Sequence, residues 1–133
     1  MSRFSLLKKY LPLGEALNIY RRIKSNKHEG FRVSRLKYPF SMRDNAYDFA
    51  TFEEVVLRET YKVPIDFTPR NIIDGGGNIG LTAAYFATRF PEASIITLEP
   101  DLENFSLLQK NTSLYKNIIA LNSGIWWRSA DLI

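Results

Sequence analysis

The spacing of apolar residues along the chain changes character near residue 70. Before that point apolar residues recur three and four positions apart, as on one face of a helix. This spacing predicts one or two short amphipathic helices within residues 3–25 and another helix over 49–61. Residues 31–43 instead alternate between apolar and polar, which predicts one or two strands around Pro39. Residues 62–70 carry two prolines, so we expect a loop there.

From residue 71 the pattern predicts strand, helix, strand, helix, strand. The expected strands are short and continuously apolar, at 71–73, 94–98 and 117–121, and the expected helices cover 78–90 and 101–112. Such strands are typical of a parallel sheet that helices cover. The fold class predicted is therefore α/β, the first half of a Rossmann-like sheet, preceded by N-terminal helices and a small β/α region. In the second helix the side chains expected to face inward are those of Leu102, Phe105 and Leu108.

Composition excludes several kinds of chemistry. The 133 residues are 45% hydrophobic and 24% charged, which is an ordinary globular composition. The absence of cysteine excludes disulfides, thiolate metal sites and a cysteine nucleophile, and a single histidine, His28, excludes a two-histidine metal site. We expect no metal ligands, no transmembrane segment because no run of 18 apolar residues occurs, and a cytoplasmic location because no convincing signal peptide is present.

Charge is unevenly distributed along the chain. Residues 1–43 hold eleven Lys or Arg and two Asp or Glu, a net of +9, whereas residues 44–133 hold seven and twelve, a net of −5. A basic arm of this kind could meet anionic sugars, phosphates or a membrane surface. The alternative is a basic helix face in water, and we favour it because the cations are scattered. The four that cluster are Arg21, Arg22, Lys24 and Lys27.

A glycine-rich segment follows the first strand of the α/β region. Asp74 at the strand tip precedes Gly75, Gly77 and Gly80, which spell the G-x-G-x-x-G pattern of dinucleotide-binding loops. Glycines here allow a tight turn and let a ligand touch the backbone. Glu99 ends the next strand, 19 residues after Gly80, where a carboxylate can accept both hydroxyls of a ribose.

Two ligands compete for this segment. A pyrophosphate would meet the carboxylate of Asp74, which is repulsive. S-adenosylmethionine (SAM) has no phosphate and carries a sulfonium and an ammonium, so an acidic strand tip favours SAM over NAD. A purely structural alternative, in which Asp74 caps a helix and the glycines only form a turn, explains Asp74 alone better than it explains the whole set.

Several further motifs, taken in order, resemble the FkbM family of SAM-dependent methyltransferases over about residues 31–128. The residues that carry the resemblance are Pro39–Arg43, Asp48, Phe52, Glu59–Tyr61, Ile72–Gly80, Phe90-Pro91, Leu98–Asp101, Glu103–Phe105, Leu108 and Lys110-Asn111. The resemblance implies a Rossmann-like fold that binds SAM and transfers its methyl group, usually to a hydroxyl of a sugar or secondary metabolite. The acceptor would be a small molecule or a glycan.

The resemblance also implies roles for single residues. The motif that holds the amino-acid part of SAM matches Asp74, Gly76, Asn78 and Gly80, and we expect Gly75 and Gly77 in the same loop to belong to the cofactor site. Glu99 matches the ribose-binding acid, and Pro100 and Asp101 lie near the adenine. Ser123–Trp126 would line the adenine edge, although Trp126 suits a core position equally well. A departure from the family pattern is the extra glycine of Gly76-Gly77, which we expect to cost backbone entropy without blocking SAM.

On this basis we expect three regions: a basic amphipathic helical arm (1–30), an N-terminal strand/helix region of the methyltransferase domain (31–70) and an incomplete SAM-binding half (71–133). The family's sheet has seven strands, and residues 131–133 resemble an element that is cut off, so we expect a C-terminal truncation. Weak SAM binding, or self-association through an exposed sheet edge, would follow.

Two alternatives remain: an inactive methyltransferase remnant and an NAD-binding oxidoreductase half. No general base can be assigned; His28, Asp48 and Tyr61 are weak candidates. Nucleic-acid binding has no support beyond the basic arm.

Overall fold

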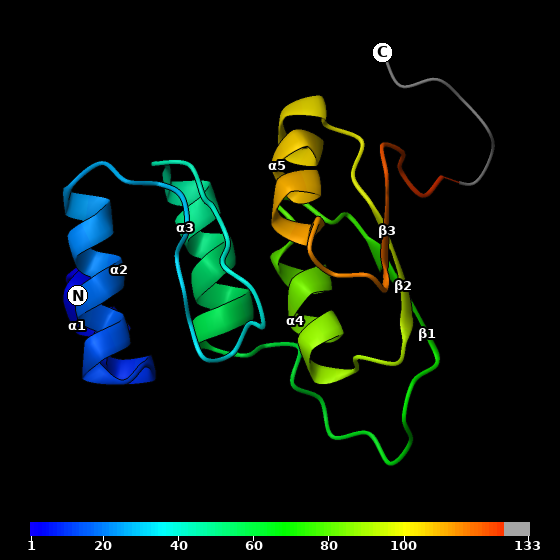
Figure 1. Ribbon diagram of the computed structural model, residues 1–133, viewed down its shortest axis with the longest axis horizontal. Helices are drawn as coiled ribbons and strands as arrows, with labels where there is room; N and C mark the ends of the chain where they lie inside the picture. The colour runs from blue at the N-terminus through cyan, green and yellow to red at the C-terminus, as the bar shows by residue number, and fades with distance from the viewer. Residues whose placement is uncertain (127–133) are drawn as a thin grey trace. The chain divides into compact units, whose positions relative to one another are not determined.

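The computed structural model describes residues 1–126 (Figure 1). The chain forms two compact units, Met1–Pro64 and Ile65–Ile133. The element expected at 131–133 lies outside the described residues. Among residues 1–126, no helix has the length and apolar character needed to cross a membrane. We describe each unit by itself.

The first unit begins with two helices, as the apolar spacing predicted. Helix α1 covers Arg3–Tyr10, and the Ser2 side chain caps it by accepting a hydrogen bond from the Ser5 N–H. Helix α2 covers Leu13–Lys24 and starts directly after Pro12, which lacks an N–H and is therefore tolerated at a helix start. Both helices bury one apolar face, which contains Leu7 and Ile19.

The third helix of this unit differs from the prediction at both ends. Helix α3 covers Ala46–Phe52 and continues as a π-helix, η1, over Glu53–Leu57. It starts three residues earlier than expected because the Asn45 side chain accepts a hydrogen bond from the Asp48 N–H. In the π-helix the Arg58 N–H donates to the carbonyl of Glu53, five residues back.

The strands expected over residues 31–43 were wrong. The structure forms a single antiparallel bridge there, between Phe31 and Phe40. A turn in which the Leu36 N–H donates to the Val33 carbonyl replaces the extended run. The alternation of apolar residues instead supplies core side chains: the rings of Phe31 and Phe40 stack with centroids 5.5 Å apart, and Phe52 follows 5.2 Å from Phe40.

Arg35 joins three backbone segments of the first unit. Its guanidinium donates to the carbonyls of Val56 and Leu57 at 2.7 and 2.6 Å and to that of Tyr10 at 2.9 Å. These carbonyls lie at the C-terminal ends of η1 and α1, where the helix leaves acceptors without partners. Arg35 therefore caps two helices at once, and Glu59 lies 3.7 Å from its Nε.

We expect Arg35→Lys to destabilise the protein by about 1–3 kcal/mol, because an ammonium cannot reproduce the planar fork of the guanidinium. Urea unfolding followed by circular dichroism measures the change. Arg32→Lys, at an exposed position nearby, is the control and should be neutral. Equal stability of the two variants would contradict the capping role of Arg35.

The second unit is a three-stranded parallel sheet in the order β1-β2-β3, which confirms the predicted fold class. Its elements are β1 (Asn71–Gly75), α4 (Leu81–Arg89), β2 (Ser94–Leu98), α5 (Leu102–Thr112) and β3 (Ile118–Leu121). Both helices lie on the same face of the sheet (Figure 1), because successive right-handed crossovers that add strands in one direction place their helices together.

The two faces of this sheet differ in burial. The helix-covered face contributes Ile95 and Thr97 to a core shared with Ile79, Leu81 and Leu108, all fully buried. On the opposite face the register aligns Ile73, Ile96 and Ile119 in one row, and Ile73 and Ile119 are 70% and 53% exposed. Leu102, expected to face inward, is 72% exposed; it is the first residue of α5, and the buried stripe starts later.

The connection from β1 to α4 is built from closely packed glycines. A Cβ on Gly77 would overlap the Thr97 hydroxyl and come within 2.6 Å of Leu108, so β2 and α5 leave no room for a side chain. Gly80, the N-cap of α4, has φ +86°, which favours glycine. The extra glycine at Gly77, expected only to cost entropy, is thus required by packing.

We expect Gly77→Ala to destabilise the protein by about 3 kcal/mol through overpacking. Gly76→Ala is the comparison, because Gly76 has φ +99° but no atom within 4 Å of its Cβ position; it should lose only about 1 kcal/mol through backbone strain. Urea unfolding of both variants tests this order. A smaller loss for Gly77→Ala than for Gly76→Ala would contradict the packing argument.

Candidate functional site

Two carboxylates meet at the edge of the sheet where the parallel strands end. Asp74 is the penultimate residue of β1, directly before Gly75, and Glu99 directly follows β2. Asp74 lies opposite Thr97 in the register, and Glu99 lies two residues beyond Thr97, close enough for its charge to act on Asp74. Ligands of open α/β sheets bind at this edge. The structure therefore brings together the two acidic residues that the sequence singled out.

Asp74 lies opposite Thr97 in the sheet register, and the Thr97 hydroxyl donates to its Oδ2 at 2.8 Å. The carboxyl is half-buried. Burial raises its pKa above the usual value and the nearby charge of Glu99 raises it further, while the Thr97 hydrogen bond opposes both. The folded protein thus disfavours the charged form of the Asp74 carboxyl group. Acids whose charged form is disfavoured in this way are typical of functional sites.

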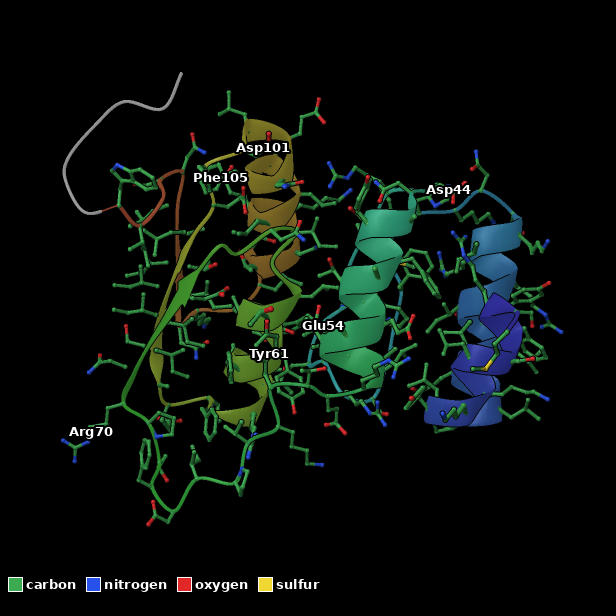
Figure 2. All side chains as sticks on the ribbon, turned by 180° about the vertical axis from the view of Figure 1, so that it is seen from behind. Asp44, Glu54, Tyr61, Arg70, Asp101 and Phe105 are labelled. Atoms are coloured by element: carbon green, nitrogen blue, oxygen red, sulfur yellow. The ribbon has the colours of Figure 1, made fainter. Side chains whose placement is uncertain are left out.

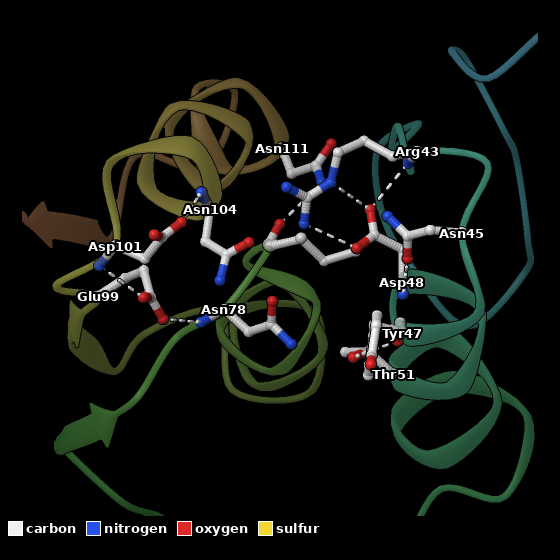
Figure 3. A network of polar contacts seen from close by, with 11 residues as sticks. Arg43, Asn45, Tyr47, Asp48, Thr51, Asn78, Glu99, Asp101, Asn104 and Asn111 are labelled. Carbon is white, nitrogen blue, oxygen red and sulfur yellow. Dashed lines mark hydrogen bonds and ion pairs between the residues drawn. The ribbon is translucent and has the colours of Figure 1, made fainter.

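Glu99 ties two loops together. Its Oε2 accepts a hydrogen bond from the Asn78 N–H at 2.8 Å, and its Oε1 accepts one from the Asp101 N–H at 2.9 Å (Figure 3). The residue is only 7% exposed. Each carboxylate oxygen can accept more than one hydrogen bond, so these contacts orient Glu99 without exhausting its capacity as an acceptor.

The N–H groups of the glycine loop are directed into the protein. Those of Gly76 and Gly77 both donate to the Leu98 carbonyl, at 2.9 and 2.7 Å, and that of Asn78 donates to Glu99. Asn78 itself has φ +49°, a conformation that asparagine tolerates better than most residues. A loop of this kind differs from a phosphate-binding loop, whose N–H groups point at the ligand.

The residues after Glu99 start helix α5. Pro100 is exposed, and Asp101 is the N-cap of α5, with Oδ2 accepting from the Asn104 N–H at 2.9 Å. Figure 2 shows Asp101 at the start of α5. Its side chain therefore has a structural role whether or not it also lies near a ligand. Phe105, which is one turn further along α5, is partly buried.

Three polar residues that sequence reasoning did not assign support the site. Thr97 holds Asp74, as described above. The Asn111 side chain donates to the Ile79 carbonyl at 2.8 Å, which joins α5 to the glycine loop. Asn122 donates to the carbonyls of Glu99 and Pro100 at 2.9 and 3.1 Å. For Thr97 and Asn122 the available signal was a polar residue inside or directly after an apolar strand, whereas Asn111 lies in an amphipathic helix and offers no such signal.

The weak candidates for a general base all lie in the first unit. His28 is half-buried, with its Nε2 2.7 Å from the Asn26 Oδ1. Asp48 is 1% exposed, and its carboxylate accepts from the Arg43 side chain at 2.8 and 3.0 Å (Figure 3). Tyr61 is exposed. Asp48 is thus committed to an ion pair, which disfavours it as a base.

The segment after β3 remains at the surface within the described residues. Trp126 is 66% exposed, so a core position for this residue was wrong. Gly75 is the contact point of this segment with the site, since a Cβ there would come within 2.6 Å of Ile125. Whether Ser123–Trp126 line a ligand stays a prediction.

Comparisons with known proteins agree with a methyltransferase relationship. No protein-family model matches the chain. The chain is 32% identical over 63 residues to a protein named Methyltransferase 1 from Beauveria bassiana (strain ARSEF 2860). This match covers 47% of the chain and 25% of that relative, so the chain spans about a quarter of the relative's length. The chain is therefore a distant, partial relative of a fungal methyltransferase.

Proposed function

We propose that this chain is the SAM-binding part of a methyltransferase of the FkbM type that methylates a hydroxyl on a sugar or secondary metabolite. The observation that carries the proposal is the pair of carboxylates, Asp74 and Glu99, at the ends of neighbouring parallel strands. The partial similarity to a fungal methyltransferase supports the same class of activity.

The chemistry of the site favours SAM over a dinucleotide. A pyrophosphate would face two carboxylates, and three of the loop N–H groups that could offset this repulsion already donate to Leu98 and Glu99. SAM carries positive charge on its sulfonium and ammonium and has no phosphate. The acidic strand tip of Asp74 therefore attracts the groups that SAM presents. The alternative of an NAD-binding half rests on the G-x-G-x-x-G pattern of Gly75, Gly77 and Gly80 alone.

The described residues fit SAM. Asp74 and the loop of Gly75, Gly76, Gly77, Asn78 and Gly80 would hold its amino-acid part. They would do so through carboxylate and carbonyl oxygens, because the N–H groups of Gly76, Gly77 and Asn78 already have acceptors. No atom lies within 4 Å of the Cβ position of Gly76. Glu99 would accept the ribose hydroxyls. Pro100 and Asp101 would lie near the adenine. When bound, SAM supplies an electrophilic methyl group, and a hydroxyl acceptor additionally requires a group that takes its proton.

Isothermal titration of the 133-residue chain with SAM and with NAD tests this proposal. We expect saturable binding of SAM and none of NAD. Glu99→Gln should weaken SAM binding by about tenfold or more, because an amide offers a donor where the ribose requires an acceptor. Glu92→Gln, which removes a charge at an exposed position of the same unit, is the matched control and should bind as the parent does.

Because Glu99 also ties two loops, thermal unfolding of Glu99→Gln without ligand separates a folding defect from a binding defect. A variant that unfolds cooperatively near the parent temperature and still binds SAM normally would contradict the role of Glu99. Saturable NAD binding without SAM binding would overturn the proposal in favour of the oxidoreductase alternative. Absence of both would favour the inactive remnant.

We expect Asp74→Asn to raise thermal stability near pH 7 by a few degrees while weakening SAM binding. Because the pKa of Asp74 is raised in the folded state, its stabilising contribution is complete below the unfolded-state value of 3.8 and is lost as pH rises through the higher folded-state value. Asparagine carries no charge at any pH, so the variant does not lose this stability as pH rises. Its side-chain oxygen can still accept the hydrogen bond from the Thr97 hydroxyl.

The difference in melting temperature between Asp74→Asn and the parent should therefore shrink as pH falls towards 4. Asp66→Asn, at an exposed position of the same unit, is the control and should show no such difference at any pH. A lower melting temperature of Asp74→Asn at pH 7 would show that the charged carboxylate stabilises the fold, contrary to this argument.

A further inference from the structure

The first unit contains a cavity of about 410 Å³ along α2 and the turn that follows it. Three cationic side chains line it, those of Arg21, Arg22 and Lys27, and no carboxylate does. Asn18 and Ser25 add an amide and a hydroxyl to the lining. The cavity thus gathers hydrogen-bond donors and positive charge in one place.

These cations differ from four of the five other arginines of the first unit, the exception being the exposed Arg32. Arg3, Arg35, Arg43 and Arg58 each lie within 4 Å of a carboxylate. Among the described residues, none of the three cations of the cavity has such an ion pair. Arg22 is instead held by the Glu29 carbonyl, to which its Nη1 donates at 2.9 Å.

The electrostatics of α2 explain only part of this charge. The C-terminal end of a helix carries a partial negative charge of about half an elementary charge, which favours a nearby cation. One cation is sufficient for that role, and Lys24 occupies the last turn as well. Three further cations around one hollow repel one another, and an anion between them removes the repulsion.

We propose that this cavity binds a phosphate group. The planar guanidinium groups of Arg21 and Arg22 match phosphate oxygens in a bidentate manner, and Lys27 adds a point charge. Leu17 provides apolar surface for the organic part of a phosphorylated molecule. A compact cluster of this kind, open to solvent, suits a single phosphate better than a nucleic-acid backbone, which requires a stripe of charges. The proposal is independent of SAM binding in the second unit.

The test is a titration of the isotope-labelled full chain with inorganic phosphate at low ionic strength, followed by amide NMR shifts. We expect saturable shifts confined to residues that line the cavity, with sodium chloride of equal ionic strength producing none. Shifts spread evenly over the basic residues of the first unit, or no saturation, would show only general electrostatic attraction and would overturn the proposal.

Paired variants test the contribution of the side chains. Arg21→Gln combined with Lys27→Gln removes two exposed cations of the cavity and should weaken phosphate binding at least about tenfold. Lys8→Gln combined with Lys9→Gln removes the same charge from α1, outside the cavity, and should change binding less than about twofold. Equal losses in both double variants would overturn the site. Thermal unfolding checks that both remain folded.

Two further ligands identify the source of the phosphate. Glucose 6-phosphate represents a free phosphorylated metabolite, and phosphatidylcholine vesicles containing phosphatidic acid represent a lipid headgroup. If glucose 6-phosphate or the vesicles bind to the parent but not to the Arg21, Lys27 double variant, the site is supported. The ligand that binds then identifies the source of the phosphate group. Binding of a DNA oligonucleotide without localised shifts by inorganic phosphate would overturn the proposal and point to a nucleic acid instead.

Discussion

The geometry of the sheet edge depends on the carboxylate of Glu99. One oxygen receives the N–H of Asn78 from the loop after β1, and the other receives the N–H of Asp101 at the start of α5. Two connections that are far apart in sequence are thereby fixed to one side chain that is almost fully buried. Without this carboxylate two inward-facing N–H groups would lose their acceptor. The same residue that would recognise a ribose thus also orders the loops around it.

The two units gather charges of opposite sign. In the second unit, Asp74 and Glu99 approach each other at the strand ends, and burial raises the pKa of Asp74. In the first unit, Arg21, Arg22 and Lys27 surround a cavity without an acidic partner among the described residues. Charges that a fold holds in unfavourable positions are candidates for ligand contacts, because a ligand of opposite charge stabilises them. The two proposed ligands follow this difference, a cationic one for the second unit and an anionic one for the first.

Sequence pattern predicted most of the α/β unit. The strand at 94–98 matches β2 residue for residue, because a continuously apolar run between helices leaves few alternatives. The first unit was harder: the aromatic residues Phe31 and Phe40 alternate as in a strand but form one bridge, since a turn between them brings their rings together in the core. The acidic site residues were identified from their places after strands. The contributions of Thr97 and Asn111 depend on register and helix packing, which no local pattern specifies.

The hydrogen bond between Thr97 and Asp74 has a consequence for how the sheet assembles. The strands β1 and β2 are otherwise apolar over much of their length, so neighbouring isoleucines would tolerate more than one alignment. A slip of one residue would place Ile96 or Leu98 opposite Asp74, and neither can donate a hydrogen bond to a half-buried carboxylate. The hydrogen bond between Thr97 and Asp74 thus favours the observed register of β1 and β2 over a register shifted by one residue, whether or not a ligand is bound.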